Sequence, residues 1–312
     1  MDWRDLTGKS RLDQMKDAIR ILIQWQQSVY YMPLLENPSA YAEEKDRIAA
    51  VLVDNHLGKL AKKIRMLPDK PGENPDVFLN QWSEIVFMSH LWMQFDSLSD
   101  SLKLNLLYQS GPNITKKHLE QIPPYSGEFH VVSVILTAEE NLQRRTVYLL
   151  DRLANQIFML VDYSFRNQPF ERMYEVGETY KGEVILYPVH RNHRIRIENW
   201  MKVSGSDQDS KIVVKTDLFH LADSFSVLLR ENPFASPIPT IVLLHSTFKK
   251  ETGWKAMDQN GNILRINDEN GEERLFAFYS TVFYAPVPVM GLWDQSGFLP
   301  QSYYNGEEFV PF

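Results

Sequence analysis

The feature of this sequence that most constrains its fold is a change in the spacing of its apolar residues. Before residue 109 they recur at three- and four-residue steps, which is typical of amphipathic helices. After residue 128 they fall in short β-branched and aromatic runs that are separated by turn residues. Such runs are typical of strands, so the two parts of the chain are expected to fold differently.

Glycine and proline gather between the two patterns, in residues 109–128, at Gly111, Pro112, Pro123, Pro124 and Gly127. These residues disfavour continuous helices and strands and are expected at a domain boundary. A chain of 312 residues is also long for one core. We therefore predict an α+β protein with a helical domain, residues 1–122, followed by a mainly antiparallel β-rich domain, residues 123–312, that carries one or two helices.

Three long helical segments are predicted in the first domain. One spans Ser10 to Tyr30 with Ser10 as its N-cap, and a second runs from Ser39 to Leu67. The third begins at Asn74, with Pro75 at its first helical position. Because it is apolar over more than half of its circumference, we place it at the centre of the domain. Its aromatic residues are interpreted as core rather than as a ligand pocket: Phe78, Trp82, Trp92 and Phe95.

The second domain is predicted to begin with five strands, in residues 130–137, 145–153, 156–164, 183–189 and 193–203. A helix capped by Thr216 or Asp217 is expected to follow and to end before Pro233. The remaining chain is predicted as strands, including the run ERLFAFYS, residues 273–280. Within it, Asn260-Gly261 predicts a two-residue hairpin turn.

The composition argues against several classes of function. A net charge of -7 opposes a large nucleic-acid surface, because such binding depends on many Lys and Arg residues. The absence of cysteine excludes disulfides, thiol nucleophiles and thiolate zinc sites, and it favours a reducing cytoplasm. The N-terminus has no apolar signal core and no apolar run approaches the roughly 20 residues of a membrane span, so we expect a cytoplasmic protein.

The only locally basic segment contains His190, Arg191, His193, Arg194 and Arg196. Arginine pairs with oxyanions through two hydrogen bonds, so this segment is a candidate patch for an anion, a nucleic-acid backbone or an acidic partner. The alternative is a solvated turn between two strands. A metal site here is disfavoured, because the neighbouring arginines repel a cation.

No segment carries the pattern of a known catalytic or cofactor-binding motif. The sequence lacks a G-x-S-x-G nucleophile elbow, a P-loop and a G-x-G-x-x-G phosphate loop. We therefore name no catalytic residue, no cofactor and no metal ligand. A site assembled from distant residues stays open, because convergence in space cannot be seen in a sequence.

Several segments resemble the region that follows the zinc finger in bacterial SWIM zinc-finger family proteins. LVDNHLGKLAKKIRML, from Leu52 to Leu67, is similar to VDxQxxGLAxxLRxL, and ENLQRRTVYLLDRLANQIFMLVDYSF is similar to RRxWLxGxxxGRxALxLDF. VILYPVHRNHRIRI and LRENPFASPIP resemble YPxxxPLRA and PWxxRxP. GWKAMDQNGNILRI and VPVMGLWDQSGFLPQS resemble WxLxDxxGxxLPL and GEWDGxxxxPLS. The segments keep the family's order from about residue 12 to residue 302.

The resemblance does not extend to the finger, because a CxCxnCxH site needs three thiolates and the chain has none. The family is associated with genes for a MoxR-type AAA+ ATPase and a von Willebrand factor A protein, so the resemblance implies an accessory or adaptor subunit. The residues at matching motif positions are expected to be fold signatures rather than catalytic groups: Arg144, Arg145, Asp162, Tyr187, Pro188, Arg194, Trp254, Asp258, Gly261, Trp293, Asp294 and Gly297.

The leading functional expectation is a non-enzymatic interaction or adaptor subunit of a cytoplasmic bacterial assembly, working with such an ATPase and von Willebrand factor A protein. One alternative is a nucleic-acid-associated protein that uses the basic segment. The other is an unrecognised enzyme whose site is assembled from distant residues.

Overall fold

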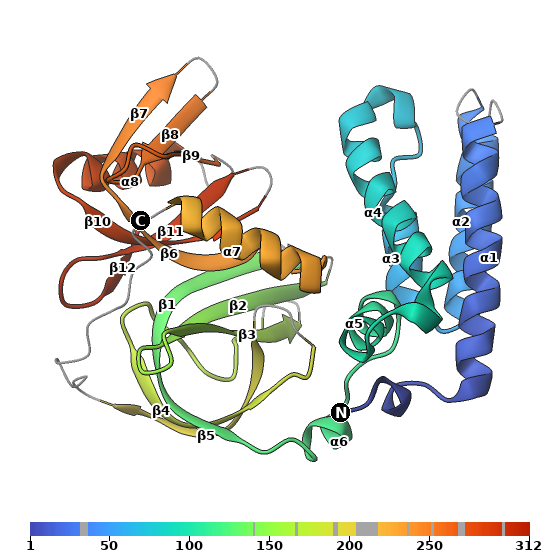
Figure 1. The fold of residues 1–312 in the computed structure, drawn as a ribbon, viewed down its shortest axis with the longest axis horizontal. Coiled ribbons are helices and arrows are strands. Elements are labelled where there is room, and N and C mark those ends of the chain that lie inside the picture. Colours follow the sequence, from blue (N-terminus) through green and yellow to red (C-terminus); the bar gives the residue numbers. More distant parts are fainter. Residues whose placement is uncertain are drawn as a thin grey trace. The chain divides into compact units, whose positions relative to one another are not determined.

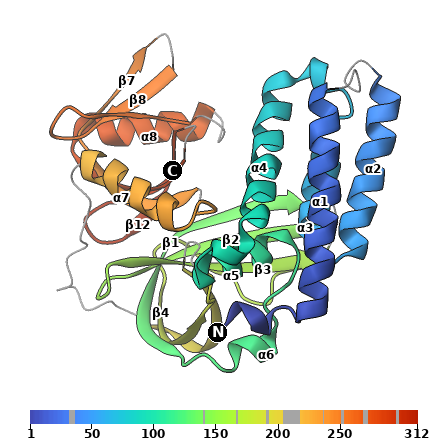
Figure 2. The same cartoon turned by 45° about the vertical axis from the view of Figure 1, so that its right-hand side comes forward.

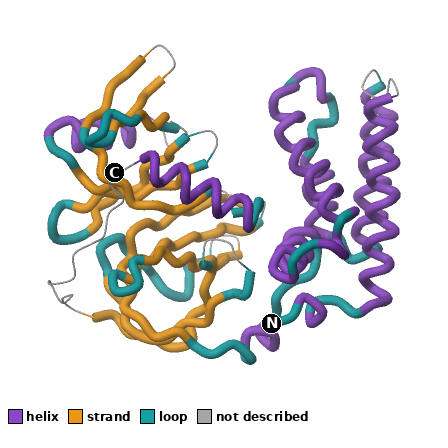
Figure 3. The backbone as a smooth tube through the Cα atoms, in the orientation of Figure 1, coloured by secondary structure: helices purple, strands orange, loops and turns teal. Residues whose placement is uncertain are grey.

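The protein divides into two compact units, Met1–Gln121 and Ile122–Phe312 (Figure 1). The computed structural model describes residues 1–31, 37–139, 141–165, 168–189, 193–203, 218–235, 237–250, 253–267, 272–294 and 297–312. The first unit is helical and the second is rich in antiparallel strands (Figure 3), which confirms the predicted α+β class. The division falls inside the glycine- and proline-rich stretch.

The helical unit is organised around α4, which packs against α1, α3 and α5. Figure 2 shows α1, α2 and α4 running side by side. The aromatic residues of the predicted core are buried, and the Trp82 ring meets the Trp25 ring edge-on at 5.3 Å. The elements are η1 (Trp3–Asp5), α1 (Lys9–Tyr31), α2 (Pro38–Asp54), α3 (Gly58–Met66), η3 (Pro71–Glu73), α4 (Pro75–Met93), η4 (Phe95–Ser97), α5 (Asp100–Ser110) and α6 (Lys116–Leu119).

The predicted helix boundaries were partly wrong. Ser10 lies inside α1 and does not cap it. The single helix predicted from Ser39 to Leu67 is two helices, because the chain turns at His56, where φ is 65°. Gly58 follows this turn as the first residue of α3. The turn is packed closely, since a Cβ on Gly111 would lie 1.9 Å from the His56 carbonyl oxygen.

The β-rich unit begins with a closed barrel in the strand order β1-β2-β3-β5-β4. Its pairs are antiparallel except β3 and β5, which run parallel. This five-stranded Greek-key order is that of an OB-type barrel. On β2, Val147 and Leu149 point into the barrel. The strands are β1 (Tyr125–Glu139), β2 (Leu142–Asp151), β3 (Gln156–Phe165), β4 (Thr179–Leu186) and β5 (Arg194–Val203).

A second sheet, in the order β12-β11-β10-β6, packs against the outside of the barrel. In Figure 1 it lies directly above β1 and β2. A bulge in β1 turns Val132 outward, and its carbonyl oxygen accepts a hydrogen bond from the Ser302 hydroxyl group. The strands are β6 (Ile238–Leu244), β10 (Val287–Trp293), β11 (Phe298–Tyr304) and β12 (Phe309–Pro311).

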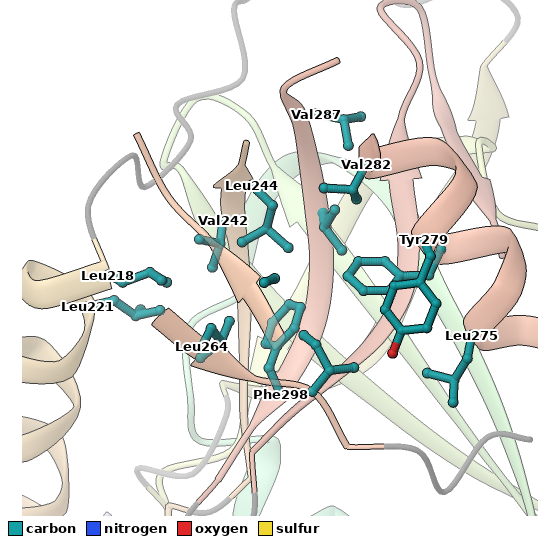
Figure 4. Packing of buried hydrophobic residues seen from close by; sticks show 14 residues of the cluster. Leu218, Leu221, Val242, Leu244, Leu264, Leu275, Tyr279, Val282, Val287 and Phe298 are labelled. Atoms are coloured by element: carbon teal, nitrogen blue, oxygen red, sulfur yellow. The ribbon is translucent and has the colours of Figure 1, made fainter. Parts of the chain in front are cut away.

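The opposite face of the second sheet is covered by a third layer of helices and short strands (Figure 4). Successive side chains of a strand point to opposite faces, so Val287 and Val289 enter this outer core while Met290 and Leu292 pack toward the barrel. The elements of the third layer are α7 (Leu218–Glu231), β7 (Ser246–Lys250), β8 (Gly253–Met257), β9 (Ile263–Arg265) and α8 (Glu272–Tyr284).

The strand predicted at residues 273–280 is wrong, because this segment forms α8. Its buried residues are Leu275, Phe278, Tyr279 and Val282, and their spacing of three and four is that of a helix. The run is aromatic and short, which favoured a strand, but it buries only one side against the second sheet. The three- and four-residue spacing of apolar residues over the whole of α8 indicates a helix more reliably than the short aromatic run indicates a strand.

The hairpin predicted at Asn260-Gly261 exists, but its loop is longer than two residues. Strand β8 ends at Met257 and β9 begins at Ile263. The buried Asp258 carboxylate accepts hydrogen bonds from the backbone N–H groups of Asn260 and Asn262 and from that of Leu218 at the start of α7. The predicted caps, Thr216 and Asp217, lie outside the described residues.

Replacing Asp258 is therefore expected to destabilise both the turn and the start of α7. Burial raises the pKa of Asp258, but the hydrogen bonds from Leu218, Asn262 and Asn260 together hold this pKa below its ordinary value. We expect Asp258→Ala to lower the free energy of unfolding by about 2 to 4 kcal/mol, measured by urea denaturation at pH 7.

The variant Asp258→Asn keeps the shape of the side chain and removes its charge, so it isolates the contribution of the charge to stability. A carboxyl with a lowered pKa in the folded state stabilises the protein above its unfolded pKa, and this contribution is lost as the pH falls through the folded value. The stability difference between wild type and Asp258→Asn should accordingly shrink below about pH 4. A difference that stays constant with pH would contradict this assignment.

Candidate functional site

The described part of the basic segment lies where the β4–β5 connection ends: His193 precedes β5, and Arg194 and Arg196 belong to β5. His190 and Arg191 lie outside the described residues. His193 is exposed with a positive φ of 43°, and its ring lies 6.0 Å from that of Phe158. Its carbonyl oxygen accepts a hydrogen bond from the Met159 N–H group, which helps to join β5 to β3.

Arg194 and Arg196 alternate with the buried Ile195, so both lie on the outer side of β5. The Arg194 guanidinium lies 4.5 Å from the centre of the Tyr187 ring, and the Arg194 carbonyl oxygen accepts a hydrogen bond from the Tyr187 N–H group. Arg196 is ion-paired with Glu198. The structure thus places two of the five candidate residues on the same side of β5.

The barrel surface that OB folds use for ligands is largely occupied within this chain. In that fold the outer face of β2 and β3, with the β1–β2 and β4–β5 loops, binds oligonucleotides and oligosaccharides. Here the outward side chains Tyr148, Leu150 and Met159 pack against Ile241 and Met290 of the second sheet. Among the described residues, the exposed side chains of this face lie at its end near the β1–β2 connection and include Leu142 and Tyr163.

Arg145 is the largest of the fully buried side chains, and its role is structural. Its guanidinium binds the Asp162 carboxylate through two hydrogen bonds of 3.0 and 2.5 Å, from Nε and Nη2. Nη2 also donates to the Arg172 carbonyl oxygen, and the rings of Phe170 and Tyr174 lie 4.1 and 4.7 Å away. The cluster fastens the segment between β3 and β4 to the barrel.

Other positions of the family-like motifs also have local structural contacts. The Trp254 ring stacks on Tyr279 at 3.5 Å. Gly297 has φ of 143° and donates a hydrogen bond to the Asp294 carboxylate in a turn, where a side chain would be strained. These contacts stabilise the local fold at both positions.

An exposed aromatic surface on α8 was not predicted from the sequence. We define the α8 aromatic surface as Phe276, Ser280 and Phe283, which lie on one side of the helix at four- and three-residue steps. Phe276 is 75% exposed and Phe283 is 71% exposed. The buried residues of α8 take its other side, so helical periodicity would have revealed this surface if the segment had been recognised as a helix.

Within the described part of the chain, no group of three or more His, Asp or Glu side chains is placed to hold a metal ion. No helix in the same residues is both long and apolar enough to cross a membrane. In comparisons with known proteins, no family model matches the chain and no curated protein matches its sequence.

Variants of Arg145 and Asp162 test whether this ion pair stabilises the fold. Removing one partner of a buried ion pair leaves an uncompensated charge, and Arg145 has only 2% of its side chain exposed. We expect Asp162→Ala to lower the free energy of unfolding by about 3 kcal/mol in urea denaturation followed by tryptophan fluorescence.

The double variant Arg145→Met, Asp162→Leu serves as the control, because it removes both charges and keeps the apolar volume. The double variant should lower the free energy of unfolding by less than Asp162→Ala alone does. If Asp162→Ala were as stable as wild type, the pair would not hold the barrel, and a structural role for these two residues would be excluded.

Proposed function

We propose that the chain is a non-enzymatic interaction subunit whose α8 aromatic surface contacts a partner protein. The exposure of two phenylalanines on one side of a helix is the observation that carries this proposal. Aromatic residues are enriched at the cores of protein interfaces, and exposed apolar patches often mark interaction sites. Burying one such side chain fully contributes roughly 1.5 to 3 kcal/mol.

The rigidity of α8 supports the same proposal. The helix is held on its inner side by Leu275, Phe278 and Val282 in the outer core, and Arg274 Nε donates a hydrogen bond to the Phe312 carbonyl oxygen. The exposed rings are therefore presented from a fixed element, which lowers the conformational entropy lost on binding. This geometry suits docking, whereas a catalytic site needs ionisable groups that converge.

The identity of the partner comes from the family resemblance alone. We propose a cytoplasmic bacterial assembly in which the chain works beside a MoxR-type AAA+ ATPase and a von Willebrand factor A protein. The acidic net charge of -7 would favour a partner surface with basic residues around an apolar centre.

Phe276→Asp should weaken binding to the partner at least tenfold, because it places a charge in the middle of the proposed contact. The measurement is isothermal titration calorimetry with the purified ATPase and, separately, with the purified von Willebrand factor A protein. Leu153→Asp is the matched control, since Leu153 is 85% exposed in the turn between β2 and β3.

Both variants should fold as wild type does, with unchanged melting temperatures. Equal affinities of Phe276→Asp and wild type would exclude the α8 aromatic surface as the contact. Absence of binding to either purified protein would exclude the proposed partners.

A second candidate function is nucleic-acid binding at the β4–β5 connection. The position of His193 at the end of this loop of an OB-type barrel, with Arg194 next to it at the start of β5, favours it. The pairing of Arg196 with Glu198 and the covered face of β2 and β3 count against it. We therefore rank it below protein interaction.

Salt dependence separates the two candidates. If the loop binds nucleic acid, the affinity for a fluorescein-labelled 20-nucleotide single strand should fall with salt, with a slope of about 0.7 per phosphate contact on logarithmic axes. Arg194→Gln should then reduce the slope by about one contact, whereas Lys249→Gln on β7 should not. If the anisotropy of the labelled strand does not change as protein is added at 50 mM salt, nucleic-acid binding is excluded.

A further inference from the structure

A polar cavity of about 970 Å³ lies within the β-rich unit, between the barrel and the turn that joins β11 to β12. The barrel contributes His130 from β1, Arg152 from the turn after β2, and Lys202 from the end of β5. The opposite wall is formed by Glu307 and Glu308. No part of this cavity belongs to the α8 aromatic surface or to the basic segment.

The turn that holds the two glutamates is built by the Asn305 side chain. Its Oδ1 atom accepts hydrogen bonds of 2.9 Å from the backbone N–H groups of both Glu307 and Glu308. Gly306 completes the turn with φ of 107°, which other residues rarely adopt. The glutamates therefore project from a fixed backbone.

The floor of the cavity is fixed to the barrel as well. The Gly177 N–H group donates to the Val131 carbonyl oxygen at 2.9 Å, and the Val131 N–H group donates to the Glu178 carbonyl oxygen at 2.8 Å. Gly177 has φ of 95°, which other residues rarely adopt, so a glycine is favoured where the turn approaches the floor. The two walls thus keep a defined separation.

One ion pair inside the cavity is already complete. Glu178 accepts hydrogen bonds from Lys202, from the Tyr180 hydroxyl group and from the Glu175 N–H group. Burial raises the pKa of Glu178, but Lys202 and the other donors hold this pKa below its ordinary value. Lys202 and Glu178 therefore compensate each other and leave little charge for a ligand.

Arg152 differs from Lys202, because its Nε atom is buried without a hydrogen-bond acceptor among the described residues. The nearby His130 does not compensate it. His130 is 5% exposed, its Nδ1 atom lies 2.8 Å from the Thr179 hydroxyl oxygen, and burial followed by the Arg152 charge lowers the pKa of His130 to about 4. The imidazole is neutral at pH 7, so the Arg152 Nε–H group is a donor that a ligand in the cavity could satisfy.

The remaining charges of the cavity are acidic. Glu175, Glu307 and Glu308 line it, and none of the ion pairs found among the described residues involves them. A simple anion would meet Arg152 but would be repelled by these three carboxylates. A simple cation would leave the Arg152 Nε atom without an acceptor. A ligand that carries both kinds of charge satisfies both walls.

We infer that this cavity binds the C-terminus of a peptide that ends in basic residues. The terminal carboxylate accepts hydrogen bonds from Arg152, and a lysine or arginine side chain pairs with Glu307 and Glu308. Arginine holds carboxylates through paired hydrogen bonds, which suits this role. The inference adds a second binding site and does not depend on the α8 aromatic surface.

The test uses the full chain and a fluorescein-labelled peptide Gly-Gly-Lys-Arg with a free C-terminal carboxylate, followed by fluorescence anisotropy at 50 mM salt. Wild type should bind it in a saturable manner. The double variant Glu307→Gln, Glu308→Gln should bind at least tenfold more weakly. The control Glu171→Gln, Asp223→Asn makes the same charge change at exposed residues outside the cavity and should bind as wild type does.

The contact between the peptide carboxylate and Arg152 is tested separately. Arg152→Gln should bind at least tenfold more weakly, whereas Lys181→Gln, an exposed basic residue of β4, should not. Amidating the peptide C-terminus should weaken binding to wild type by a similar factor and should have little effect on Arg152→Gln. Circular dichroism melting curves check that each variant folds.

Three outcomes would overturn the inference: no saturable binding to wild type, equal loss in the cavity and control variants, or equal binding of the free and amidated peptides. Phe276→Asp separates this site from the proposed function. It should leave peptide affinity unchanged, so loss of partner binding with intact peptide binding identifies two independent surfaces.

Discussion

The second sheet of the β-rich unit buries both of its faces, and the arrangement of the unit depends on this constraint. Alternate side chains of β10 serve different cores: Val287 and Val289 face the helices, and Met290 and Leu292 face the barrel. Because apolar side chains occupy both faces, the barrel on one side and α8 on the other are both required. The barrel loses its outer β2–β3 face as a ligand surface, and α8 is fixed with its other side exposed.

The charged residues also divide into those that stabilise the fold and those that line the cavity. Buried arginine serves the fold, as Arg145 binds Asp162 and spans the gap to the Arg172 carbonyl oxygen. The basic residues at the start of β5 are partly compensated by Glu198. At the cavity, the Arg152 Nε atom is buried and has no acceptor within the described part of the chain. The apolar contact proposed at α8 and the mixed-charge contact proposed at the cavity are separate kinds of recognition.

The sequence predicted elements whose signals are local. Pro75 and the spacing of Phe78, Trp82 and Trp92 were sufficient for α4, because a central helix shows its periodicity over many residues. The α8 segment was mistaken for a strand, since its short aromatic run resembles one. The cavity could not be predicted, because Gly177 meets Glu308 only after the β11–β12 turn folds back on the barrel. In the sequence those glutamates look like an ordinary solvated turn.

We propose that α8 is the surface that the chain presents to its partner, while the second sheet covers the barrel. Amide hydrogen–deuterium exchange, with and without the purified MoxR-type ATPase, tests this proposal most directly. We expect slower exchange in residues 272–284 on binding and no change in residues 142–165. Slowing confined to residues 142–165 and 193–203, with α8 unaffected, would contradict it.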